Sequence, residues 1–76
     1  MIEKIIELIR EILPYEQINE NTELVESGIL NSLSIVALIT QLEDEFCVEI
    51  ADDAVTAKNF SSVREILRLI EENNKT

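Results

Sequence analysis

The chain has 76 residues, 46% of them hydrophobic, with a single glycine and a single proline. This length allows one domain, over residues 1–76, with one compact core. The composition excludes disordered, collagen-like and low-complexity classes. We find no N-terminal signal pattern and no apolar run that could span a bilayer. We therefore expect a cytoplasmic protein without membrane insertion.

Sixteen acidic residues oppose six basic ones, for a formal net charge of −10. This charge disfavours nucleic acid, whose binding requires Lys and Arg to meet phosphate, and it attracts basic protein partners. It is equally consistent with charge that only keeps a small domain in solution. The chain has no histidine, which is the most frequent general acid or base and the most frequent metal ligand. We therefore predict neither catalysis by the chain itself nor a metal site.

Residues 2–13 have the periodicity of an amphipathic helix, with isoleucine and leucine on one face and charged residues on the other. Pro14 ends this helix, because the residue before a proline avoids the helical region. Residues 14–31 form a long, mostly polar connection, and such a loop in a small domain is usually functional. Gly28, near its end, favours an unusual backbone conformation there.

A second helix is predicted over residues 32–46, with Asn31 as its N-cap. Residues 47–51 are predicted to be extended. Asp52 or Asp53 is then expected to cap a short helix that reaches about as far as residue 58.

Ser62 and Glu65 form a capping box for a last helix. Its apolar stripe comprises Val63, Ile66, Leu67 and Ile70, and residues 73–76 are expected to fray. No strand pattern is present. The sequence therefore predicts an all-α domain, a small bundle of three main helices and one short helix.

The helix over residues 32–46 has two apolar faces, which one packing contact cannot cover. The face expected in the core consists of Ile35, Leu38, Ile39, Leu42 and Phe46. The opposite face consists of Leu33, Val36, Ala37 and Thr40, with Glu43 and Asp44 at its lower edge. Exposed apolar patches with a charged rim mark interaction sites, so we expect partners to bind there. In the alternative, the loop over residues 14–31 covers this face with Leu24 or Val25.

The start of this helix carries a family resemblance. The stretch Ser27-Gly28-Ile29-Leu30-Asn31-Ser32-Leu33 resembles the attachment motif of the acyl and peptidyl carrier proteins. Like residues also fall at Val36, Leu38, Leu42, Glu43, Glu45, Phe46, Glu49, Ile50 and the Phe60-Ser61-Ser62-Val63 stretch. The resemblance covers essentially the whole chain and implies the small four-helix bundle of that family.

The resemblance also implies a function. Ser32 is expected to receive a 4′-phosphopantetheine arm, whose thiol carries an acyl or aminoacyl group as a thioester. A serine at a helix start suits this, since free N–H groups and the positive end of the helix dipole favour a phosphodiester. The implied partners are a phosphopantetheinyl transferase, an acyl- or aminoacyl-loading ligase and a downstream transferase or synthase. These partners would meet a monomer at Asn31, Leu33, Val36, Ala37, Thr40, Glu43 and Asp44.

Several features leave alternatives open. The family usually has Asp before the serine, and Asn31 in that place also fits an acidic helical adaptor without a prosthetic group. Fatty-acid carriers usually place acids close behind the serine, where this chain has Ser34 and Ala37. The motif is more similar to D-alanyl carriers or to stand-alone carriers of specialised biosynthesis. We interpret Cys47 as a small, partly buried residue at a helix end, and Ser34 as lying off the motif.

Overall fold

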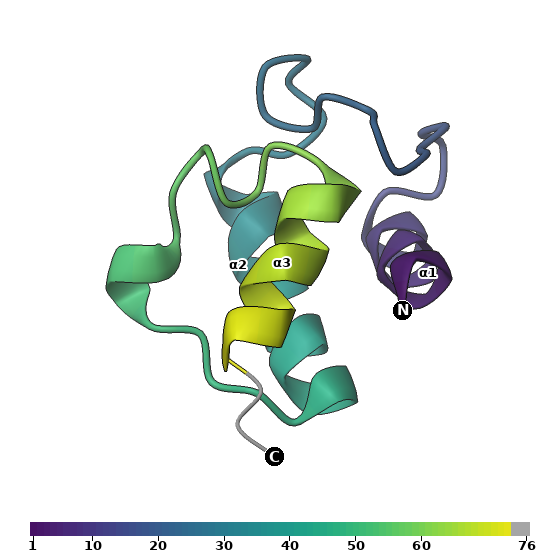
Figure 1. Cartoon of the computed structure of the whole chain (residues 1–76). Helices are drawn as coiled ribbons and strands as arrows, with labels where there is room; N and C mark the ends of the chain where they lie inside the picture. The colour runs from purple at the N-terminus through teal and green to yellow at the C-terminus, as the bar shows by residue number, and fades with distance from the viewer. Residues whose placement is uncertain (74–76) are drawn as a thin grey trace.

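The computed structural model of the chain describes residues 1–73. It contains three α-helices and one 3-10 turn: α1 (Ile2–Ile12), α2 (Ser32–Phe46), η1 (Asp52–Ala54) and α3 (Val63–Asn73). No strand occurs in the described part of the chain. Helix α1 packs against both α2 and α3 (Figure 1). This arrangement confirms the all-α bundle that the sequence predicts.

One hydrophobic core draws on all three helices and on the loops between them. The buried side chains are Ile5, Leu8, Ile9, Ile18, Leu24, Leu30, Leu38, Leu42, Val48, Ile50, Phe60, Val63, Ile66, Leu69 and Ile70. On α2, Leu38 and Leu42 are fully buried, while Ile35, Ile39 and Phe46 pack half-buried against this core. The core face predicted for α2 is therefore the one that packs. On α3, Val63, Ile66 and Ile70 are buried as predicted, and Leu67 packs half-buried against the core. The prediction missed Leu69, which is also buried.

The loop between α1 and α2 passes over one end of the bundle (Figure 1). Its Leu24 N–H donates a hydrogen bond of 2.8 Å to the carbonyl oxygen of Ser61, just before α3. The Arg64 N–H in α3 donates one of 3.4 Å to the carbonyl oxygen of Glu20. Gly28 has a φ of 83°, as its position in the loop predicted. The two backbone bonds hold the loop against the start of α3.

Two sequence predictions between α2 and α3 need correction. The short helix does not reach residue 58: only Asp52–Ala54 form one 3-10 turn, preceded by Ala51 without any side-chain cap. Asn59 explains the early end, because its Nδ2 donates to the carbonyl oxygen of Ala54 at 2.8 Å, and such side-chain bonds compete with helix formation. In the segment predicted to be extended, Cys47 is instead left-handed, with a φ of 53°, whereas Ala51 at its other end is extended.

The caps of α3 differ in part from the prediction. The Glu65 N–H donates to Ser62 Oγ at 3.3 Å, which is the first half of the capping box. Asn73 belongs to the helix, and its Nδ2 donates to the carbonyl oxygen of Leu69 at 2.8 Å. Asn73 is therefore the last residue of α3, and the rest of the segment predicted to fray, residues 74–76, lies outside the described residues.

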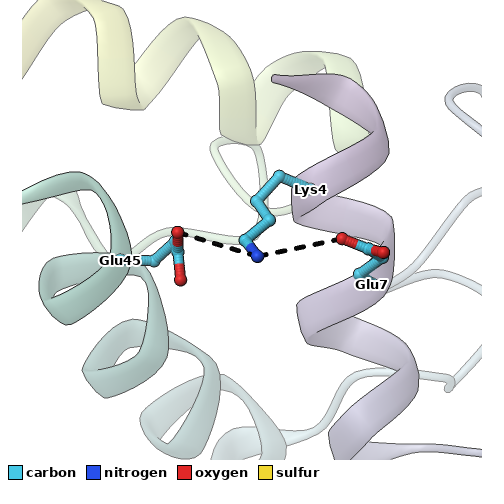
Figure 2. Close-up of polar contacts among 3 residues, drawn as sticks. All are labelled: Lys4, Glu7 and Glu45. Carbon is cyan, nitrogen blue, oxygen red and sulfur yellow. Dashed lines mark ion pairs between the residues drawn. The ribbon is translucent and has the colours of Figure 1, made fainter.

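A salt bridge connects α1 to α2 on the surface. Lys4 Nζ lies 3.7 Å from Glu45 Oε2 on α2 and 3.9 Å from Glu7 Oε2 on α1 (Figure 2). All three side chains are substantially exposed to solvent. Exposed pairs of this kind contribute about 0–1 kcal/mol to stability, so the buried side chains, and not this bridge, hold α1 against α2.

Candidate functional site

Ser32 is the first residue of α2 and is exposed to solvent. Asn31 precedes it with extended backbone angles (φ −117°, ψ −177°), as an N-cap requires. The Asn31 Oδ1 accepts a hydrogen bond of 2.9 Å from the Ser34 N–H, and the Asn31 carbonyl oxygen accepts one of 2.9 Å from the Ile35 N–H. The predicted cap is therefore present, and it fixes the start of the helix at Ser32.

The residues just before Ser32 anchor this helix start. Leu30 is buried in the core, and its N–H donates to the carbonyl oxygen of Leu24 at 2.8 Å. Leu24 is also buried, and it is the residue that bonds to Ser61. Because Leu30 points inward while Asn31 and Ser32 are exposed, the chain emerges at the surface where α2 begins.

The surroundings of Ser32 carry little charge of their own. Residues 27–42 contain no Asp, Glu, Lys or Arg, and the first turn of α2 has no acidic side chain. The first N–H groups of a helix have no partner within the helix, and its N-terminus carries a partial positive charge. An exposed hydroxyl at this position can therefore form a phosphodiester that faces no carboxylate in the same turn.

An exposed apolar surface follows Ser32 along α2. It consists of Leu33, Val36, Ala37 and Thr40, which we call the α2 patch. Leu33 is 83% exposed and Val36 is 62% exposed. The loop does not cover these residues, since Leu24 is buried in the core and Val25 packs half-buried against it. The alternative in which the loop shields this face is therefore wrong.

The two acidic residues at the lower edge of the α2 patch differ from each other. Asp44 is exposed, as a partner-binding residue must be. Glu43 is half-buried, and its Oε2 accepts a hydrogen bond of 3.0 Å from the Ile50 N–H. Sequence reasoning missed this bond, because the two residues are seven positions apart and the path of the loop between them is irregular. Glu43 therefore holds the segment after α2 in place.

Cys47 lies at the C-terminal end of α2 and is exposed, not partly buried as expected. Its left-handed backbone conformation ends α2, and the buried Val48 follows it. Within residues 1–73, no group of three or more His, Cys, Asp and Glu side chains is placed to hold a metal ion. Among the helices of that range, none has the length and apolar character to cross a membrane.

Comparison of the sequence with known proteins identifies a family. The family model described as a phosphopantetheine attachment site matches residues 3–70. A curated relative, the acyl carrier protein of Wolinella succinogenes, is 34% identical over 58 residues, which cover 76% of this chain and 74% of that protein. The chain belongs to the phosphopantetheine carrier family. Its prosthetic group is therefore covalently attached 4′-phosphopantetheine.

The residues at the start of α2 suit this carrier's prosthetic group. Attachment requires a hydroxyl that a transferase can reach, and the Ser32 side chain is exposed. The attached group is anionic, and the uncharged first turn of α2 offers it unpaired backbone N–H groups. Ser34 is half-buried, one position beyond Leu33, and its N–H already bonds to Asn31. The arrangement therefore favours Ser32 over Ser34.

Proposed function

We propose that Ser32 is the attachment residue of this carrier and that the chain presents an acyl or aminoacyl group to partner enzymes. The observation that carries the proposal is an exposed serine at the capped start of α2, in a chain of the phosphopantetheine family. When bound, the arm supplies a thiol that holds the cargo as a thioester. The protein positions the arm, because the Asn31 cap and the anchored loop fix the place where the arm leaves the surface.

The α2 patch is the surface that we propose for partners. Leu33 and Val36 are large apolar side chains left exposed beside Ser32, so an enzyme that reaches Ser32 can also cover them. Burial of such residues at the centre of an interface commonly supplies much of the binding energy. Asp44 stands at the edge of the patch, where a charge steers approach and sets orientation more than it adds affinity. The proposed partners are the phosphopantetheinyl transferase, the loading ligase and a downstream transferase or synthase.

We propose, further, that this is a dedicated carrier and not the general carrier of fatty-acid synthesis. The support is the uncharged start of α2, where Ser34 and Ala37 occupy positions close behind Ser32. An enzyme that reads acidic side chains at those positions would find none. Loading assays with fatty-acid, amino-acid and D-alanine ligases on the modified protein would distinguish these cargo classes.

Intact mass measurement tests the attachment residue. The chain is incubated with coenzyme A and a broad-specificity phosphopantetheinyl transferase, and its mass is measured before and after. We expect the wild type and Ser34→Ala to gain one phosphopantetheinyl group and Ser32→Ala to gain none. Modification of Ser32→Ala would show that another residue is the attachment site. A wild type that no competent transferase modifies would instead favour an acidic adaptor without the prosthetic group.

A further inference from the structure

The orientation of the Asn31 amide is fixed by its hydrogen bond. The atom that meets the Ser34 N–H must be an acceptor, and only Oδ1 of the amide can accept. The Nδ2 atom therefore lies on the other side of the amide group and offers two N–H donors. No hydrogen bond within residues 1–73 uses these donors, and the Asn31 side chain is exposed.

These donors lie next to the proposed attachment residue. Asn31 and Ser32 are consecutive and both exposed at the N-terminal end of α2. The N–H groups of Ser32 and Leu33 have no partner within the helix, whereas that of Ser34 is taken by Asn31. A phosphodiester on Ser32 would thus have two kinds of neutral donor nearby, backbone N–H groups and the Asn31 amide.

We propose that Asn31 is a positioning residue for the arm: its Nδ2 donates a hydrogen bond to an oxygen of the phosphodiester on Ser32. This rests on the proposed function, since it takes Ser32 as the attachment residue. Hydrogen bonds to a charged acceptor are stronger than those between neutral groups. With aspartate in this place, one carboxylate oxygen would cap the helix and the other would repel the phosphodiester. Asparagine keeps the cap and replaces that repulsion with a donor.

The test compares each variant with itself before and after attachment. Wild type, Asn31→Asp and Asn31→Gly are prepared without and with the arm, and thermal melts give the change in Tm on attachment. Glycine is an acceptable N-cap that offers no side-chain donor, and aspartate caps well but adds a charge, so all three should fold. Because each variant serves as its own reference, differences in capping cancel.

We expect attachment to raise the Tm of the wild type by about 4 °C more than that of Asn31→Gly. Attachment should leave Asn31→Asp without a gain or with a lower Tm. In the NMR spectrum of the wild type, the Asn31 side-chain N–H resonances should move downfield on attachment, as for donors to phosphate. Asn31→Gly with the same gain as the wild type would overturn the proposal, as would unmoved Asn31 amide resonances.

Failure of this inference is distinguishable from failure of the proposed function. If Ser32 is not the attachment residue, the intact mass of Ser32→Ala rises with that of the wild type, and no melt is needed. If the added mass maps to Ser32 but the three variants show the same change in Tm on attachment, Ser32 remains the attachment residue and the proposed role of Asn31 is wrong. Melts at low and at high salt distinguish charge repulsion in Asn31→Asp from loss of the amide donor. The repulsion between the aspartate and the phosphodiester should weaken when salt screens it.

Discussion

The Glu43 carboxylate in α2 accepts a hydrogen bond of 3.0 Å from the backbone N–H of Ile50, whose side chain is buried in the core. The bond therefore connects the lower edge of the α2 patch to the packed segment between α2 and η1. Glu43 therefore differs from its neighbour Asp44, which is exposed and makes no side-chain hydrogen bond within residues 1–73.

Glu43→Ala should destabilise the domain by about 1–2 kcal/mol, because the Ile50 N–H loses a charged acceptor in a half-buried position. Asp44→Ala is the matched control and should change stability by less than about 0.5 kcal/mol. Urea unfolding of both variants measures the difference. Equal stability of the two variants would show that water replaces the Glu43 carboxylate without cost.

Asp44→Lys should slow association with a basic phosphopantetheinyl transferase and reduce the salt dependence of the association rate. The dissociation rate should change little, because a charge at the rim acts mostly on encounter. Stopped-flow binding at several salt concentrations tests this without the change in folding that a Glu43 substitution brings. A slower association that persists unchanged at high salt would contradict an electrostatic role for Asp44.

Val36→Asp should weaken binding of partner enzymes at least about tenfold, because it places a charge at the desolvated centre of the interface. It should cost the free domain less than about 0.5 kcal/mol, since Val36 is 62% exposed. Leu42→Asp should unfold the domain, because Leu42 is 0% exposed and a buried charge there has no partner. Thermal melts with binding titrations separate the two effects. Undiminished binding by Val36→Asp would show that partner enzymes bind outside the α2 patch.

Asn31→Asp should speed modification of Ser32, because it restores a negative charge for a basic transferase to meet. One exposed charge pair contributes up to about 1 kcal/mol, which corresponds to about a fivefold change in rate. Stability without the arm should stay within about 0.5 kcal/mol, since both residues cap well. Initial rates of mass gain at low enzyme concentration measure the effect. Identical rates would show that the transferase does not use this position.

Cys47→Gly should stabilise the domain by about 0.5–1 kcal/mol. A left-handed conformation costs an L-residue about 1–2 kcal/mol, from which the greater chain entropy of glycine subtracts. Cys47 has a φ of 53° and is exposed, so little packing is lost. Cys47→Ala removes the thiol but keeps the unfavourable conformation, and it should not stabilise. Denaturant midpoints under reducing conditions compare the three proteins, and an equal gain in Cys47→Ala would contradict the backbone explanation.

Sequence periodicity and capping predicted most of this fold because they act locally. The bounds of α2 follow from Asn31, whose side chain reaches only three residues ahead, and the end of α1 follows from Pro14. The two faces of α2 were predictable for the same reason, since an isolated helix already separates Leu42 from Val36. In the site, the exposed Ser32 and the open α2 patch follow from this local pattern.

Features that depend on the path of a loop were not predictable from local sequence. The Glu43–Ile50 bond needs the chain to return toward α2 after Cys47, and nothing in the residues between specifies that return. The early end of η1 depends on Asn59 reaching back to Ala54, a contact that competes with helix only when both residues are already close. The orientation of the Asn31 amide likewise required the observed partner of its oxygen.

The two backbone hydrogen bonds between the loop and α3 bear on the order in which a newly made chain folds. Leu24 bonds to Ser61 and Arg64 bonds to Glu20, so the segment before Ser32 finds two of its partners in residues made some forty positions later. A nascent chain with α1 and α2 outside the ribosome still lacks both. Proteins emerge from their N-terminus first, so the segment before Ser32 can close onto the bundle only after residues 61–64 have been made. Helices α1 and α2 can therefore form before the loop that joins them reaches its final position.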